Sequence, residues 1–292
     1  VQNEYITVDL YFLPFVQPLL ERLAAVRPLV LIMDGSVVAR GCVTLMVSVI
    51  YAHRAIPIGW LVIAGAKGHF PTETHLALLR EVKALVPQTA TVIFLGDGEF
   101  DSPELQAELE GYAWEYACRT AKNIQIGVEA EWSSLADLPV KRGQRVFRKG
   151  VLFTKAAYGP VTVIAWWGAR YTEPIYLVSN MTCVQRACDW YRKRMHIETF
   201  FSDQKSRGFQ LDRSHLSEPE RVKRMMLAAC LAYLWVIYLG TVAQQADWLP
   251  LIHRRSRCDL SLFQLGLRLL NYVLNHDRPI PSSFALEPES VR

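Results

Sequence analysis

Residues 29–34 read Leu-Val-Leu-Ile-Met-Asp, and residues 91–97 read Thr-Val-Ile-Phe-Leu-Gly-Asp. Both apolar runs are short, contain β-branched residues and are bounded by glycine, so each predicts a buried strand that ends on an acid, Asp34 or Asp97. Taken singly, either aspartate is more simply a turn or helix-cap residue after a strand. A shared role for the pair therefore depends on a third residue that joins them.

That third residue lies on a predicted helix at residues 189–205. Its Tyr191, Arg194, Glu198 and Lys205 recur at steps of three, four and seven, so they share one helical face. The carboxylate suits a divalent cation, while the phenol, guanidinium and ammonium suit phosphates, which is what a phosphodiester-cleaving site on DNA requires. Considered alone, the helix fits a solvated amphipathic helix equally well.

The three acids together favour one shared site. Asp34 and Asp97 would stand at the ends of adjacent strands, and Glu198 would reach them from a helix packed on the sheet. Such an arrangement makes a three-carboxylate cup for hard cations. The sequence therefore predicts a metal-binding catalytic site.

The order of predicted elements is that of a ribonuclease H-like fold, in which a three-stranded hairpin is followed by a helix and two further strands. The expected segments are a helix near residues 17–25, strands at 41–51 and 56–64 with their turn at Ala55-Ile56-Pro57, a helix at 72–85, a helix that begins at Asp101 or Ser102 before Pro103, and a strand at 114–118. The predicted fold class is α/β, a mixed sheet flanked by helices.

Between the second aspartate and the glutamate, short β-like runs alternate with glycine and charged residues. We predict an all-β insertion subdomain at residues 121–182, which divides the ribonuclease H-like core into residues 1–120 and 183–292. Such an insertion explains the long separation of the two acids along the chain.

Two features of the insertion suggest contact with DNA. Trp166 and Trp167 are adjacent, so on a strand they point to opposite faces, and the outward ring can stack on an unpaired base. Packing of both rings in a small β core is the more ordinary explanation. A basic cluster between the strand-like runs either projects toward DNA or is a solvated face. The cluster consists of Lys141, Arg142, Arg145, Arg148 and Lys149.

Composition sets broad limits on the protein class. With 292 residues, 51% of them hydrophobic, the chain has ample material for a large core and is not a disordered tail. Its net charge of +4 is only mildly basic, so DNA contacts must come from local clusters of lysine and arginine. The six cysteines include no C-x2-C pair, which indicates reduced thiols in a cytoplasmic protein and no zinc site.

One segment imitates a membrane-spanning helix. Residues 225–243 are nearly all apolar and follow a basic stretch. Tyr233, Trp235 and Tyr238 lie in the middle of the segment, which favours a helix buried beneath the sheet. The N-terminus shows no signal-peptide pattern, so we expect a soluble protein with no membrane partner.

The chain resembles the DDE transposases of bacterial insertion sequences, specifically the branch with the Y-R-E-K signature, known as the insertion sequence 4 family. The signature is complete, and the resemblance runs from about residue 28 to about residue 240. The matching segments are Leu31-Ile32-Met33-Asp34-Gly35-Ser36, Gly96-Asp97-Gly98-Glu99-Phe100-Asp101, and Tyr191 through Lys205 with the following Gly208, Phe209 and Leu211.

This resemblance implies a metal-binding catalytic triad and a set of residues that hold backbone phosphates near the scissile bond. The triad is Asp34, Asp97 and Glu198. The phosphate-holding set is Tyr191, Arg194 and Lys205. The resemblance further implies two Mg²⁺ ions, with Mn²⁺ as a substitute, double-stranded DNA as the partner, and a homodimer in the active complex.

Three departures from the family pattern stand out. Family members often carry Asp-Gly-Thr and Gly-Asp-Arg, where this chain has Asp34-Gly35-Ser36 and Gly96-Asp97-Gly98. Neither change touches a metal ligand, but the missing arginine removes a potential DNA contact. Only about 30 residues precede the first catalytic strand, where family members usually carry a region that binds the inverted repeat. Either the chain is a fragment or it recognises ends through other surfaces.

The expected activity is cleavage at transposon ends followed by strand transfer into target DNA. Metal-activated water would release a 3′-hydroxyl, which would then attack target DNA in the same site. A truncated or domesticated relic that binds DNA without transposing is the rival hypothesis, and the intact triad disfavours it. A metal nuclease with another substrate gives no reason for Tyr191, Arg194 and Lys205.

Overall fold

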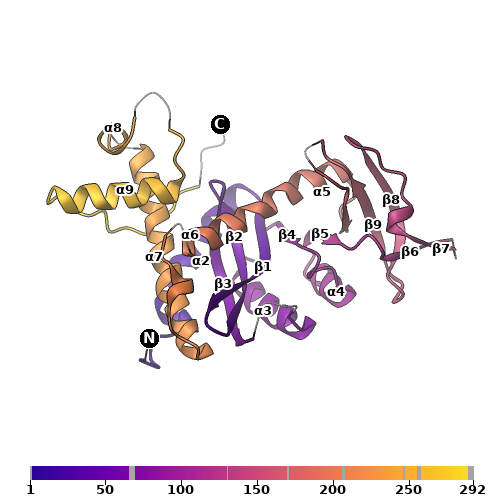
Figure 1. Cartoon of the computed structure of the whole chain (residues 1–292), viewed down its shortest axis with the longest axis horizontal. Coiled ribbons are helices and arrows are strands. Elements are labelled where there is room, and N and C mark those ends of the chain that lie inside the picture. Colours follow the sequence, from indigo (N-terminus) through magenta and orange to yellow (C-terminus); the bar gives the residue numbers. More distant parts are fainter. Residues whose placement is uncertain are drawn as a thin grey trace.

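The computed structural model describes residues 2–65, 70–129, 131–169, 171–205, 208–245, 247–254 and 258–288. Within these residues the strands form one ten-stranded mixed sheet in the order β3-β2-β1-β4-β5-β10-β9-β8-β6-β7 (Figure 1). The strands are β1 Leu29–Ala39, β2 Cys42–Tyr51, β3 Arg54–Ala64, β4 Val92–Gly96, β5 Glu115–Thr120, β6 Gln125–Val128, β7 Glu131–Ser134, β8 Arg145–Phe153, β9 Tyr158–Trp166 and β10 Ile175–Ser179.

Helices lie between and after these strands. The α-helices are α1 Val8–Tyr11, α2 Leu13–Val26, α3 Thr72–Leu85, α4 Pro103–Gly111, α5 Val184–Tyr191, α6 His196–Gln204, α7 Pro219–Gln245, α8 Leu249–Ile252 and α9 Leu262–Asn275. Short 3₁₀ turns occupy Leu135–Asp137, Arg192–Met195 and Leu211–Arg213.

The first half of the sheet has the ribonuclease H-like arrangement that the sequence predicts. Strands β1, β2 and β3 pair antiparallel, while β4 runs parallel to β1 and β5 runs parallel to β4. Every residue of β2 is buried, so helices and neighbouring strands cover both faces of the sheet here. This half of the sheet is therefore a rigid support for side chains at the ends of its strands.

The turn between β2 and β3 differs from the prediction. The two residues at the turn are Ala52 and His53, both with positive φ, as a tight hairpin requires. Pro57, which we expected in the turn, lies inside β3 beside a register shift of the β2–β3 pair. A proline removes one ladder hydrogen bond, and a bulge is where a strand tolerates that loss.

The predicted insertion is all-β, with β6 to β10 between residues 125 and 179. Its strands continue the core sheet, because β10 pairs antiparallel with β5 on one side and with β9 on the other. Figure 1 shows β6, β8 and β9 gathered at the end of the sheet away from β3. The division into residues 1–120, 121–182 and 183–292 stays a prediction, since one sheet runs through it.

The apolar segment that imitates a membrane span forms most of α7. Among the described residues, α7 is the one helix long and apolar enough to cross a membrane, and 56% of its most apolar window is buried inside the fold. Helix α9 crosses α7 at backbone contact distance. A Cβ at Gly240 would come within 2.1 Å of the Leu262 carbonyl, and one at Gly266 within 1.9 Å of the Val236 carbonyl. Both glycines are thus required for this crossing.

Candidate functional site

The two aspartates meet where β1 and β4 stop pairing. The recorded pairs end at Ile32 opposite Leu95, so Asp34 and Asp97 each lie two residues beyond the same rung. Neighbouring strands are about 5 Å apart, and residues at equivalent positions of a parallel pair face the same side. The register therefore brings both carboxylates to one point of the sheet.

The local structure at Asp34 differs from the sequence prediction. We expected the strand to end at this residue, but β1 continues to Ala39 and pairs Asp34 with Met46 of β2. Only the pairing with β4 ends, because β4 stops at Gly96. Asp34 thus lies where the sheet forks, held on one side by β2 and open to the site on the other.

The signature residues lie on a helical segment that is not uniform. We predicted one helix over residues 189–205, whereas α5 ends at Tyr191, a 3₁₀ turn holds Arg192–Met195, and α6 runs from His196 to Gln204. The backbone stays in the right-handed helical region at the junctions, so the chain keeps its direction. A tighter turn in the middle alters the angular spacing that a uniform helix would give.

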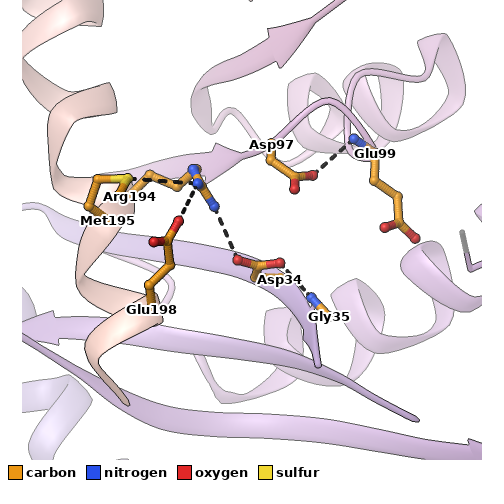
Figure 2. A network of polar contacts seen from close by, with 7 residues as sticks. All are labelled: Asp34, Gly35, Asp97, Glu99, Arg194, Met195 and Glu198. Atoms are coloured by element: carbon orange, nitrogen blue, oxygen red, sulfur yellow. Dashed lines mark hydrogen bonds and ion pairs between the residues drawn. The ribbon is translucent and has the colours of Figure 1, made fainter. Parts of the chain in front are cut away.

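Arg194 joins two of the three acids. Its guanidinium donates from Nη1 to Asp34 Oδ2 at 3.1 Å and from Nη2 to Glu198 Oε1 at 2.8 Å. Figure 2 shows Asp34, Asp97 and Glu198 arranged around this guanidinium. Asp34 and Arg194 have side chains only 16% and 12% exposed, while Glu198 is 49% exposed. The bridge links strand β1 to helix α6 across 160 positions of the chain.

The surroundings of Asp34 disfavour its charged form. Burial raises the pKa of its carboxyl to about 6, against the lowering effect of Arg194 and with a further increase from Asp97. Burial also raises the pKa of the Tyr191 phenol to about 12. Tyr191 therefore keeps its proton at neutral pH and can donate it in a hydrogen bond.

Lys205 reaches the same site from the end of α6. Its Nζ lies 2.6 Å from the Ser36 hydroxyl on β1, two residues beyond Asp34. Tyr191 is buried and lies close enough to Arg194 for their charges to interact. The structure thus brings Asp34, Arg194, Glu198 and Lys205 together, with Tyr191 beneath them.

The acids suit a divalent cation, although they do not form a finished metal site. Within the described part of the chain, no group of three or more histidine, cysteine, aspartate or glutamate side chains is close enough to hold a metal ion. Asp34 and Glu198 nevertheless both turn carboxylate oxygens to one cation, the Arg194 guanidinium. Carboxylate oxygens are the donors that Mg²⁺ and Mn²⁺ prefer. The donor set therefore fits such an ion once Arg194 moves aside.

A cleft of about 570 Å³ opens beside Asp97 and Arg194 and contains basic residues that the sequence analysis did not single out. It is lined by Arg119 and Lys122 near the end of β5 and by Tyr176 of β10. A signal was present in the sequence, because the charged Arg119 directly follows the strand predicted at residues 114–118. In the structure, Arg119 is the one exposed residue of β5. Nothing along the chain indicates that β10 pairs with β5 and also lines this cleft.

Neither of the two insertion tryptophans is fully exposed, as a ring that stacks freely on a base would be. Trp166 is buried at the end of β9, with the guanidinium groups of Arg145 and Arg192 over its ring at 5.3 and 4.8 Å. Trp167 lies just past the strand, is half-buried, and donates its indole N–H to the Tyr171 carbonyl at 3.1 Å. Trp166 is thus the inward residue of the pair, and a base contact by Trp167 stays a prediction.

The basic cluster of the insertion does not form a hairpin tip. We expected it between two strands, but Arg145, Arg148 and Lys149 lie within β8, a single strand with an irregular register against β9. Lys141 and Arg142 precede that strand, and Arg142 donates to the Ala169 carbonyl. Four of the cluster residues are exposed, and Arg145 is half-buried. The exposed residues are Lys141, Arg142, Arg148 and Lys149.

The family described as Transposase DDE domain matches residues 26–235, and the chain belongs to that family. No curated protein sequence matches the chain significantly.

A solved transposase structure confirms the fold class. The chain is similar to the piggyBac transposase in its synaptic complex with hairpin DNA, with a TM-score of 0.50 and 14% sequence identity. The similarity covers 82% of this chain and 51% of the piggyBac chain, so it spans about half of that protein. A weaker similarity links the chain to human ENDOV, with a TM-score of 0.32, 12% identity, and coverage of 77% of this chain and 100% of that one.

Proposed function

We propose that this chain is the catalytic domain of a DNA transposase of the Y-R-E-K branch, the insertion sequence 4 family. It cleaves DNA at transposon ends and transfers the cut strand into target DNA. The observation that carries this proposal is the Arg194 bridge, which joins Asp34 to Glu198 while Lys205 reaches the same strand. Membership of the transposase DDE family supports it.

Asp34, Asp97 and Glu198 are the residues that would hold the metal. We propose Mg²⁺, as two ions and with Mn²⁺ as a substitute, because the donors are all carboxylates. When bound, such ions lower the pKa of water or of a 3′-hydroxyl and neutralise charge on the leaving oxygen. Without metal, Arg194 supplies the positive charge that keeps Asp34 and Glu198 together.

The remaining signature residues act on the DNA backbone. A phosphate competes with Asp34 and Glu198 for the Arg194 guanidinium, whose fork matches two oxygens at once. Lys205 adds a point charge beside Ser36, and Tyr191 adds a neutral hydrogen-bond donor. Phosphate binding would therefore draw Arg194 away from the acids and free them for the cation.

The DNA path extends from the acids toward the insertion. Arg119 and Lys122 line the cleft beside Asp97. A DNA strand that leaves the site on this side therefore meets basic side chains. We propose double-stranded DNA as the partner, as both transposon end and target, and two copies of the chain in the active complex. The exposed basic residues of β8 supply a further backbone contact.

The test uses a labelled duplex that carries the inverted repeat flanking the gene, incubated with Mg²⁺. We expect release of a 3′-hydroxyl end and transfer of that end into a second duplex, both abolished by Asp97→Asn. Salt-sensitive DNA binding without any cleavage would support the rival relic that binds DNA and does not transpose. Full cleavage by the Asp97→Asn protein would contradict the proposed catalytic site.

A further inference from the structure

Glu99 is an acid next to the site that the proposed triad does not use. It lies two residues after Asp97, and its side chain is only 16% exposed. Its Oε1 accepts the backbone N–H of Phe70 at 2.5 Å and lies 3.4 Å from Nε2 of His75, a side chain of α3 that is 2% exposed. Burying a carboxylate is unfavourable unless donors or cations meet it. The Phe70 N–H supplies such a donor, while the His75 ring lies within ion-pair distance of the carboxylate without a hydrogen bond to it.

The contacts of Glu99 join the surroundings of both aspartates. On one side, its backbone N–H donates to Asp97 Oδ1 at 2.9 Å (Figure 2). On the other, its carboxylate holds Phe70, whose ring covers Gly35, the residue after Asp34. A Cβ at Gly35 would lie only 2.7 Å from that ring. Glu99 therefore connects the loop that carries Asp97 with the segment that covers the strand carrying Asp34.

We propose that Glu99 is a positioning residue that sets the orientation and separation of Asp34 and Asp97, with His75 as its anchor in the core. The inference rests on the proposed function, since it assigns Glu99 a role in holding the metal ligands. The loop after β4 is only a few residues long, and no strand pairing fixes it beyond Gly96. The Glu99 carboxylate replaces that missing restraint.

The core beneath Glu99 supports an anchoring role for His75. The His75 ring lies 4.8 Å from the Phe100 ring and 6.4 Å from the Phe70 ring, so aromatic side chains enclose it. Phe100 itself packs on Gly96, the last residue of β4. Outer residues that orient ligands in this way change metal affinity by about 10- to 100-fold when they are replaced.

The experiment measures Mn²⁺ affinity by electron paramagnetic resonance of the free ion, with Mn²⁺ alone as the probe. We expect Glu99→Ala to weaken Mn²⁺ binding roughly tenfold or more. Glu99→Gln keeps a carbonyl oxygen for the Phe70 N–H, so its Mn²⁺ affinity should fall by less than about fivefold. Glu104→Ala is the matched control, because Glu104 is an exposed acid on the next helix and should bind Mn²⁺ like the unmodified chain.

The outcomes separate this inference from the proposed function. If Asp34→Asn and Asp97→Asn weaken Mn²⁺ binding and folded Glu99→Ala does not, the positioning role is wrong and the metal site stands. If neither the unmodified chain nor Arg194→Gln binds Mn²⁺ through Asp34 and Asp97, the proposed function fails and the inference fails with it.

A second pair of variants covers the case in which Glu99→Ala does not fold. His75→Asn and Glu99→Gln are then compared by circular dichroism and Mn²⁺ binding. A severalfold weaker Mn²⁺ affinity in folded His75→Asn supports the anchor, whereas a lower melting temperature with unchanged affinity overturns it.

Discussion

At the scale of single residues, Arg194 has the central place in the site. It is the countercharge of Asp34 and Glu198 without metal, and it is the phosphate ligand in the proposed reaction. Arg194 cannot make both sets of interactions at the same time, because its guanidinium has too few N–H groups to bind the two acids and a phosphate fully. In the proposed reaction, metal binding and DNA binding would thus be coupled through this side chain, and such coupling is reciprocal.

We expect Arg194→Gln to destabilise the metal-free protein by roughly 1 to 3 kcal/mol, because partly buried acids lose their countercharge. Mg²⁺ should then stabilise the variant more than it stabilises the unmodified chain, since no guanidinium competes for the acids. Thermal melting with and without Mg²⁺ measures both effects. Arg192→Gln is the control, because that exposed arginine pairs with Asp189 at the surface and should shift stability by less than about 0.5 kcal/mol. Equal responses of the two variants to Mg²⁺ would contradict the competition.

The raised pKa of Asp34 predicts a pH-dependent stability. The folded chain binds this proton more tightly than the unfolded chain, whose carboxyl has a pKa near 3.8. The associated stabilisation is complete below that value and is lost as pH rises through about 6, about 3 kcal/mol in total. Urea unfolding in the presence of a metal chelator, compared with Asp34→Asn, isolates the effect. A stability difference between the two proteins that stays constant between about pH 4 and pH 7.5 would refute it.

At the scale of elements, the sequence predicts what local patterns determine. Helix α3 begins and ends where its periodicity and start signal place it, and Ser102 caps α4 just before Pro103. The 3₁₀ turn at Arg192–Met195 escaped prediction because tertiary contacts, such as the Arg192 guanidinium over Trp166, shape that segment. The fork at Asp34 was not predicted either. The pairing of β1 with β4 ends there while its pairing with β2 continues, and such a change of partner leaves no signal in the local sequence.

The two insertion tryptophans should respond oppositely to truncation. Trp166→Ala removes a buried ring at the end of β9 and should cost roughly 3 to 5 kcal/mol of stability. Trp167→Ala loses one hydrogen bond from a half-buried ring, so its stability should fall by only about 1 kcal/mol. If Trp167 stacks on a base, end processing should fall by about tenfold or more. Chemical denaturation and the end-cleavage assay distinguish the two, and equal losses of stability would show that both rings are packing residues.

At the scale of the whole molecule, the insertion and the core share one sheet. The sequence indicates the β content of residues 121–182 but not the pairing of β10 with β5, because that contact joins segments about 60 residues apart. The same pairing places β10 beside β5, and Tyr176, Arg119 and Asp97 all line the cleft. The three acids were predictable because each follows a strong local pattern, whereas the walls around them depend on how the sheet is assembled.

DNA binding by the assembled surface should depend on salt. Lys205→Ala removes one backbone contact, so it should weaken binding across sequences and lower the slope of log affinity against log salt by about one unit. Lys155→Ala, at the β8–β9 turn, is a charge-matched control away from the site. Fluorescence anisotropy at several salt concentrations gives both slopes. Identical slopes for both variants and the unmodified chain would show that Lys205 does not contact the DNA backbone and has only a structural role beside Ser36.

We propose that Asp34, Asp97 and Glu198 share a divalent cation in place of Arg194. A crystal structure grown with Mn²⁺ and a DNA duplex tests it most directly, because anomalous scattering locates the ion without assumptions about the reaction. We predict anomalous density within coordination distance of carboxylate oxygens from all three acids, with the Arg194 guanidinium withdrawn to a DNA phosphate. Manganese bound elsewhere, with Arg194 still bridging Asp34 and Glu198 in the DNA complex, would contradict the claim.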